Sequence, residues 1–295
     1  MNTFELKVVD PGNEALRTSF NALIKESFGF DFEKWYQDGH WPETYLPHVL
    51  LEGEMVVANV SVNLQTMNLK GVVKQFAQLG AVATKKSHQK QGLSRQLMEA
   101  VLEKYRPQCD QIHLYANDQV VDFYPKFGFV KSSETQYYLD KPASGTGTEL
   151  RQLDLNQAGD LELLRQKAAL GNPYSAFFMD NAASLTLFYA TYFMKRDVYY
   201  LPEHDLVILA QMPNLFNREL TLMEVLGEER ISLNELIGYL TPKKTKEVIL
   251  GFTPMNKKDF TPHPFKEAGS TLFILNPDLD ITTTSSCMFP ILTHT

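Results

Sequence analysis

The sequence contains no apolar run that approaches the roughly 20 residues needed to cross a bilayer, so no membrane partner is expected. Its first residues carry acidic side chains and no apolar stretch, which argues against a secretory signal peptide. Cysteine is also scarce. Cys109 and Cys287 lie far apart and have no C-x-x-C partner, so we expect neither a disulfide scaffold nor a metal site. A cytoplasmic location is the simplest expectation.

Positive charge is not in surplus, since the formal net charge is −7. A general nucleic-acid binder carries a basic surplus, so no nucleic-acid partner is expected. One segment departs from this average, because no Asp or Glu lies between Met55 and Met98. An acid-free basic segment in an acidic protein predicts a local anion site, although a solvated surface could have the same composition. Its basic residues are Lys70, Lys74, Lys85, Lys86, Lys90 and Arg95.

The chain of 295 residues is long enough for two domains. Residues 141–148 are rich in Pro, Gly, Ser and Thr, which is typical of a linker. We therefore predict a first domain at residues 1–142, a linker at 143–149 and a second domain at 150–295. Strand and helix signals alternate in both halves, which predicts an α/β fold. The first half has helical spacing at 15–28 and 93–105. A short helix is expected at 118–127, with Asp118 as its N-cap and Gly128 as its C-cap, and a strand at 135–139 is expected to close this half. The second half is expected to contain a strand at 271–275.

A polar loop joins the buried strand around residue 80 to the helix at 93–105. Its residues are Gln89-Lys90-Gln91-Gly92-Leu93-Ser94. The first N–H groups of a helix have no partner inside the helix, and the helix dipole adds positive potential there. Gly92 would let a ligand approach the backbone closely. The loop therefore predicts a site for a phosphate or pyrophosphate group.

This loop resembles the Q/R-x-x-G-x-G/A acyl-CoA loop of the GNAT superfamily of N-acetyltransferases, with Ser94 in place of the final Gly or Ala. The preceding Val82-Ala83-Thr84 resembles that family's splayed fourth strand. A second segment, from Asn117 through Tyr124 to Gly128, resembles the family's N-x-x-A-x-x-F-Y-x-K-x-G-F segment. The resemblance implies a mixed twisted sheet with flanking helices in the first half.

The length and the early aromatic residues resemble the tandem-GNAT branch that includes the enhanced-intracellular-survival acetyltransferases. That resemblance implies that the second half is a degenerate GNAT-like α/β domain. No Q-x-x-G loop follows Val225, where Gly-Glu-Glu-Arg stands instead. The second domain is therefore not expected to bind CoA.

The resemblance implies acetyl-CoA as cosubstrate and direct transfer of its acetyl group to an amine. It implies main-chain contacts from Val82 and Thr84, pyrophosphate binding by residues 89–94 and pantetheine binding by Asn117. Asn117 could instead only cap a turn. Tyr124 matches the family's general acid, which protonates the leaving thiolate. A core tyrosine with its hydroxyl bonded elsewhere is the alternative.

The general base has no motif of its own. Many relatives carry a Glu on the fourth strand, but this sequence has Gln75 and Gln78 there. A water relay or the terminal carboxylate of Thr295 could serve, the latter because the resembling branch uses its chain end. The other candidates are Glu33, Asp38, His40 and Glu43. The apolar residues 288–292 are expected to pack as a closing strand or extended segment.

The acceptor is an amine of unknown identity: a small molecule, a peptide or a protein lysine. Residues 32–45 are aromatic and fall where the family binds acceptors, so they could form an acceptor site or a lid packed on the second domain. The sequence thus predicts an N-acetyltransferase. A non-catalytic acyl-CoA-binding or interaction module is the alternative, and a homo-oligomer is left open.

Overall fold

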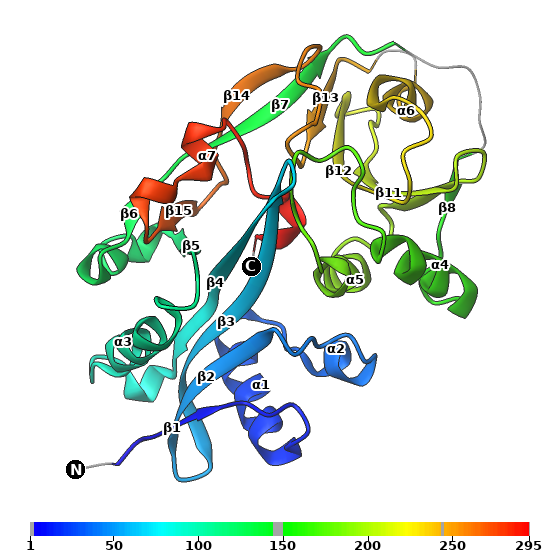
Figure 1. Ribbon diagram of the computed structural model, residues 1–295. Coiled ribbons are helices and arrows are strands. Elements are labelled where there is room, and N and C mark those ends of the chain that lie inside the picture. Colours follow the sequence, from blue (N-terminus) through cyan, green and yellow to red (C-terminus); the bar gives the residue numbers. More distant parts are fainter. Residues whose placement is uncertain (1–2, 144–149, 243–244, 295) are drawn as a thin grey trace.

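The structure, a computed structural model, describes residues 3–143, 150–242 and 245–294. Within those residues the strands form two mixed sheets, here called sheet A and sheet B, with helices packed around them (Figure 1). The expected mixed α/β architecture with flanking helices is therefore confirmed.

Sheet A has the strand order β1-β2-β3-β4-β5-β15-β6, and β9 pairs with β3. Its paired strands are antiparallel except β4 and β5, which are parallel. A parallel pair needs a crossover connection, which helix α3 (Leu93–Tyr105) provides. The strands are β1 Glu5–Val8, β2 Tyr45–Glu52, β3 Met55–Leu69, β4 Val72–Thr84, β5 Gln111–Asn117, β6 Val130–Lys131, β9 Phe177–Met179 and β15 Ser270–Ile274.

Helices α1 (Glu14–Phe28) and α3 cover opposite faces of sheet A. Successive strand residues point to opposite faces, and in β2 Leu50 packs with α3 whereas Val49 and Leu51 pack with α1. Both helices follow the apolar spacing of the sequence. The Asn13 side chain caps α1 by accepting a hydrogen bond from the Leu16 N–H at 3.1 Å.

Sheet B has the strand order β14-β7-β13-β12-β11-β10-β8. Its strands are β7 Glu134–Asp140, β8 Arg151–Gln152, β10 Val198–Leu201, β11 Leu206–Gln211, β12 Glu219–Leu226, β13 Glu247–Leu250 and β14 Thr261–Phe265. The remaining α-helices are α2 Glu33–Gln37, α4 Ala158–Ala168, α5 Ala183–Tyr192, α6 Leu233–Leu240 and α7 Ile281–Thr284.

Each sheet contains strands from both halves of the chain. The expected strand at 135–139 exists as β7, but it pairs with β13 and β14 of sheet B rather than closing sheet A. The expected strand at 271–275 exists as β15, but it lies between β5 and β6 of sheet A. Both strands exist as expected, but their pairing crosses between the halves, because alternation along a strand does not encode its partner. Residues 144–149 of the expected linker lie outside the described residues, and the sheets do not divide there.

The expected helix at 118–127 is wrong. The chain forms two short 3₁₀ turns instead, at Asp118–Val120 and Tyr124–Phe127. Pro125 has no backbone N–H to bond to an earlier carbonyl, and its ring crowds the preceding turn, so one continuous α-helix cannot run through it.

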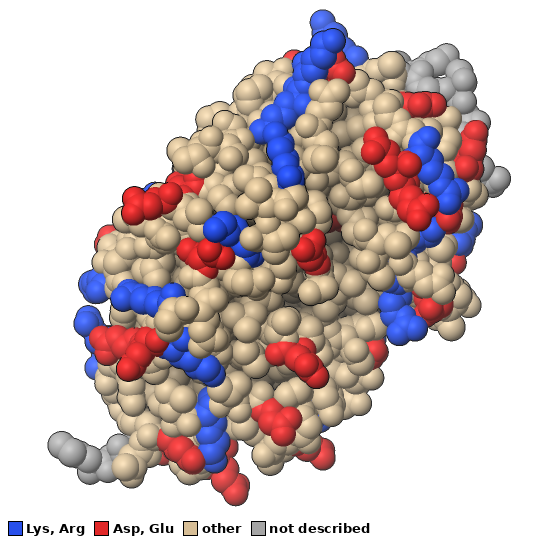
Figure 2. Space-filling view, in the orientation of Figure 1, with Lys and Arg blue, Asp and Glu red and all other residues tan. Residues whose placement is uncertain are grey.

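The surface carries charges of both signs. On the face shown in Figure 2, Lys and Arg side chains are interspersed with Asp and Glu, and the middle of that face has few charged side chains. In the part of the chain that the structure describes, no helix has the length and apolar character needed to cross a bilayer.

Candidate active site

Strands β4 and β5 separate at the centre of sheet A. They pair only where Phe76–Leu79 faces Gln111–Leu114, and both strands continue beyond that pairing. At this point Ala81 has a φ of 48°, in the left-handed region that L side chains rarely adopt. Its carbonyl accepts a hydrogen bond from the Asn59 side chain at 2.8 Å. The strained backbone therefore turns β4 away from β5 and opens a splay between them.

The loop after β4 has the geometry of an anion site. Lys90 and Gly92 have φ values of 65° and 80°, and α3 starts at Leu93. A Cβ atom at Gly92 would meet nothing within 4 Å, so the loop leaves open space at the helix N-terminus. Gln89, Lys90, Gln91 and Gly92 are exposed, whereas Leu93 is buried. The loop thus presents free N–H groups and a lysine to solvent.

Two of the predicted residues hold this loop in place. The hydroxyl groups of Thr84 and Ser94 lie 2.6 Å apart, which ties the end of β4 to the first turn of α3. Their side chains therefore position the loop, and among the described residues one of the two hydroxyl groups keeps its O–H free to donate to a ligand.

A cavity of about 370 Å³, which we call the splay cavity, lies where the two strands separate. It brings together three of the predicted site residues, Val82, Asn117 and Tyr124. Its other lining residues are Phe28, Leu79, Gly80, Ala81, Tyr115, Val120, Glu267, Ala268, Gly269, Ser270 and His294.

Asn117 both caps a turn and reaches this cavity. Its side-chain oxygen accepts a hydrogen bond from the Gln119 N–H at 2.9 Å, so the capping alternative is correct for that atom. Among the described residues the NH₂ group has no partner, which leaves a donor for a ligand.

Tyr124 is only 5% exposed, and its ring packs against Phe123 and Phe273. Within the described chain its hydroxyl has no hydrogen-bond partner, although it lies in the lining of the splay cavity. Burial raises the pKa of Tyr124 to about 12. The hydroxyl therefore stays protonated at neutral pH and can donate a hydrogen bond.

A buried polar network at the splay cavity was not predicted from the sequence. The Tyr115 hydroxyl lies 2.9 Å from His294 Nε2 and donates to Glu134 Oε1 at 3.1 Å. On its other side, His294 Nδ1 lies 3.5 Å from Glu267 Oε2. Burial lowers the pKa of His294, but the two carboxylates outweigh it and raise that pKa. His294 in turn lowers the pKa of Glu267, which is 39% exposed and is the carboxylate facing the cavity.

No local signal could have identified this network. Glu267 precedes β15 and Glu134 begins β7, the two strands that cross between the halves. Their approach to Tyr115 depends on strand pairing that the sequence pattern does not specify.

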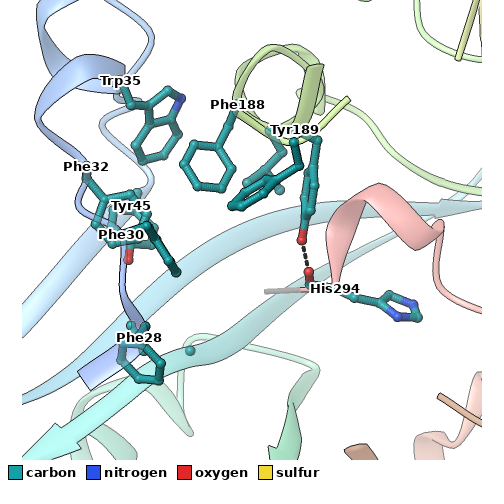
Figure 3. A pocket seen from close by; sticks show the side chains of 12 residues that line it. Phe28, Phe30, Phe32, Trp35, Tyr45, Phe188, Tyr189 and His294 are labelled. Carbon is teal, nitrogen blue, oxygen red and sulfur yellow. Dashed lines mark hydrogen bonds between the residues drawn. The ribbon is translucent and has the colours of Figure 1, made fainter. Parts of the chain in front are cut away.

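The C-terminal segment is extended, which is one of the two predicted forms, and it ends in a 3₁₀ turn at Ile291–Thr293. It was expected to belong to the second domain, but it contacts both sheets, since Phe289 packs with Phe76 and Leu292 packs with Val207. The Phe289 N–H donates to Glu134 at 2.8 Å, and the Ile291 N–H donates to the Gly251 carbonyl at 2.8 Å. The His294 carbonyl accepts from the Tyr189 hydroxyl (Figure 3). Thr295 itself lies outside the described residues.

An aromatic pocket of about 330 Å³ adjoins the splay cavity (Figure 3). It is lined by Phe28, Phe30, Phe32, Trp35, Tyr45, Gly80, Ala81, Leu185, Phe188, Tyr189, Phe193 and His294. Four of these residues, Phe28, Gly80, Ala81 and His294, also line the splay cavity. The two spaces therefore meet at the strained turn of β4.

The aromatic stretch at residues 32–45 both lines this pocket and packs on the second half. The Trp35 indole donates to the Ser184 carbonyl at 3.3 Å, and its backbone N–H donates to the Tyr192 hydroxyl at 3.0 Å. The stretch therefore packs on the second half, as one alternative predicted, whereas its role as an acceptor site stays a prediction.

None of the four side chains suggested as a base, Glu33, Asp38, His40 and Glu43, lines either space. Glu33 pairs with Arg17 at 2.9 Å, and Asp38 pairs with Lys34. On strand β4, the Gln78 side chain is fully buried and accepts from Gln65 at 2.9 Å. Among the described residues no group of three His, Cys, Asp or Glu side chains could hold a metal ion.

Residues 9–131 match the sequence model of the acetyltransferase (GNAT) domain. A comparison with curated proteins gave no match. Among solved structures, the chain is similar to a conserved protein of unknown function from Enterococcus faecalis V583, described as a probable N-acyltransferase. The two share 12% identity over 93% of this chain and 72% of the other, with a TM-score of 0.59.

Two further structures are similar over almost the whole chain. The match to Eis1 from Mycobacterium abscessus has 13% identity and a TM-score of 0.54, and it covers 92% of this chain and 73% of Eis1. A GCN5-related N-acetyltransferase from Kribbella flavida has 16% identity, covers 92% and 71%, and has a TM-score of 0.54. At these identities the likeness concerns the fold, and it extends the resemblance to tandem GNAT proteins over both halves.

Proposed function

We propose that the protein is an N-acetyltransferase that moves the acetyl group of acetyl-CoA to an amine, because residues 9–131 match the acetyltransferase (GNAT) domain. The observation that carries this proposal is the open splay of sheet A. The splay has an anion loop beyond one strand, a protonated tyrosine in its cavity and a separate pocket that meets it. The family match supports acyl transfer as the general activity, whereas the donor and the acceptor are proposals.

The donor would bind along β4. Its pyrophosphate accepts hydrogen bonds from the N–H groups at the start of α3, beside Lys90 and Gly92, where the helix dipole adds roughly half a positive charge. Its pantetheine arm runs past the main chain of Val82 and Thr84 towards the NH₂ group of Asn117. The residues present fit this group, since the loop is exposed and no side chain fills the space at Gly92.

Transfer takes place where the two spaces meet. The amine nitrogen attacks the thioester carbonyl carbon, the C–S bond breaks, and the products are an amide and CoA. Unpaired N–H groups of splayed β4 can stabilise the oxyanion that forms on the carbonyl oxygen. The Tyr124 hydroxyl donates to the departing sulfur. Because its pKa of about 12 exceeds that of a thiol, near 8.5, the tyrosine stabilises the thiolate by a hydrogen bond, and solvent completes the protonation.

An ammonium group must lose one proton before it attacks and a second as the amide forms, and the second is balanced by protonation of the CoA thiolate. Glu267 is the carboxylate of the splay-cavity lining, and it is held beside His294. We assign the proton acceptor to Glu267, directly or through a water molecule. The terminal carboxylate of Thr295 is the competing candidate, because the preceding residue lines both spaces.

The proposal is tested by CoA release from acetyl-CoA in the presence of a panel of primary amines, with amide formation followed by mass spectrometry. Stoichiometric amide and CoA support it. Binding of acetyl-CoA without amine-dependent CoA release would favour the non-catalytic acyl-CoA-binding module instead.

A further inference from the structure

The aromatic pocket has an unusual composition for a site that receives an amine. Eight of its 12 lining residues are Phe, Tyr or Trp, and no Asp, Glu, Lys or Arg is among them. Its two tyrosine hydroxyls are already engaged, Tyr45 with Ser61 at 3.0 Å and Tyr189 with the His294 carbonyl. The pocket therefore offers apolar surface and ring faces, with few free polar groups.

We propose that the acceptor is an amine carried on an aromatic or similarly apolar group, in chemical terms an arylalkylamine. Its ring occupies the aromatic pocket, and its amine lies at Gly80 and Ala81. This rests on the proposed function, because it assigns the second substrate of the same site.

The size of the pocket limits that group. An apolar cavity of about 150 Å³ holds one benzene ring. The volume of about 330 Å³ therefore suits one fused bicyclic ring, or one ring with a short linker. A folded protein or a long peptide chain does not fit inside it.

The charges around the pocket select against polycations. A second ammonium group would lose its hydration without meeting a carboxylate. The acids at the two ends of helix α2 are bound elsewhere, since Glu33 pairs with Arg17 and the C-cap Asp38 pairs with Lys34. A single ammonium group can approach over ring faces by cation–π attraction, and the apolar surroundings then lower its pKa towards the reactive neutral form.

The pocket also has its own mouth. Phe193 is 56% exposed and lines this pocket but not the splay cavity. An acceptor can thus enter without passing the CoA site, which a complex of enzyme with both substrates requires. A long acyl chain of the donor would need no such mouth.

The test compares kcat/KM for tryptamine and phenethylamine with that for n-butylamine and spermidine, using acetyl-CoA. We expect a preference for the aryl amines on the order of 10–100-fold over n-butylamine. Phe193→Glu places an acid at the mouth and should reduce that preference at least fivefold while improving the use of spermidine. Phe216→Glu is the matched control, because Phe216 is fully exposed outside the pocket.

Three outcomes would overturn the inference. Turnover with equal or better use of n-butylamine or spermidine rejects an aryl acceptor. If the enzyme uses octanoyl-CoA better than acetyl-CoA, and aryl amines compete with octanoyl-CoA for binding, the pocket holds the acyl chain of the donor. If none of the amines releases CoA, the proposed function is rejected, and the pocket assignment is then tested on its own. In that case the melting temperature with acetyl-CoA and tryptamine decides, and the absence of a tryptamine-dependent shift also rejects the pocket assignment.

Discussion

Replacing Tyr124 by Phe should separate catalysis from stability. The hydroxyl has no hydrogen-bond partner among the described residues, and the ring packs between Phe123 and Phe273. The substitution therefore breaks no protein hydrogen bond and keeps the packing, so the free energy of unfolding should change by less than about 0.5 kcal/mol. Loss of the hydrogen-bond donor to the thiolate should lower kcat on the order of 10²–10³-fold, which corresponds to about 3–4 kcal/mol of barrier.

The assay measures acetyl-CoA affinity, urea unfolding and single-turnover acetyl transfer, so that product release does not hide the chemical step. Tyr137→Phe is the matched control, because Tyr137 is also buried but donates to the Ser286 carbonyl at 2.9 Å. The control should lose about 1 kcal/mol of stability and keep its kcat. A Tyr124→Phe enzyme whose single-turnover rate stays within about threefold of wild type would remove Tyr124 from the mechanism.

The remaining predictions concern two carboxylates and the chain end. Glu267→Gln should lower kcat on the order of 10²-fold or more with unchanged acetyl-CoA binding. Deletion of Thr295 alone should lower kcat less. If the deletion lowers kcat more than Glu267→Gln does, the terminal carboxylate is the base. Burial raises the pKa of Glu224 from 4.5 to about 7. The protonated side chain therefore makes its full contribution to the free energy of unfolding below pH 4.5, and this contribution is lost as the pH rises through 7. Glu224→Gln should therefore be more stable than wild type at pH 8, by up to about 3 kcal/mol. Equal urea midpoints of the two proteins at pH 8 would contradict this.

The sequence predicted the features that depend on local spacing. The apolar period placed both α1 and α3, and the loop at residues 89–94 could be recognised because a helix N-terminus and its glycine are adjacent in the chain. Two residues of the splay cavity, Asn117 and Tyr124, were predicted from a second short segment of the sequence. Their chemical roles stay predictions until they are tested.

What depended on long-range pairing could not be predicted. β7 and β15 have ordinary strand patterns, yet each pairs in the other sheet, and that exchange brings Glu134 and Glu267 to His294. The turn at Pro125 was predicted as part of a helix because Asp118 and Gly128 suit the two ends of a helix, and the missing N–H group of Pro125 was not weighed. The strain at Ala81, which opens the splay, has no sequence signal, since alanine is not a residue typical of positive φ.

The measurement that tests the central claim most directly is the acetyl-CoA-dependent melting temperature of Gly92→Glu beside that of Gly71→Glu. Both glycines have positive φ, 80° and 88°, and neither would crowd a Cβ atom, so the backbone strain is matched and only the acyl-CoA loop is altered. Acetyl-CoA at about 100 times its Kd should stabilise wild type and Gly71→Glu by about 2.7 kcal/mol, a shift of several degrees. We predict that Gly92→Glu folds but shows no shift. A full shift in Gly92→Glu would contradict the assignment of the donor site to the splay of sheet A and its loop.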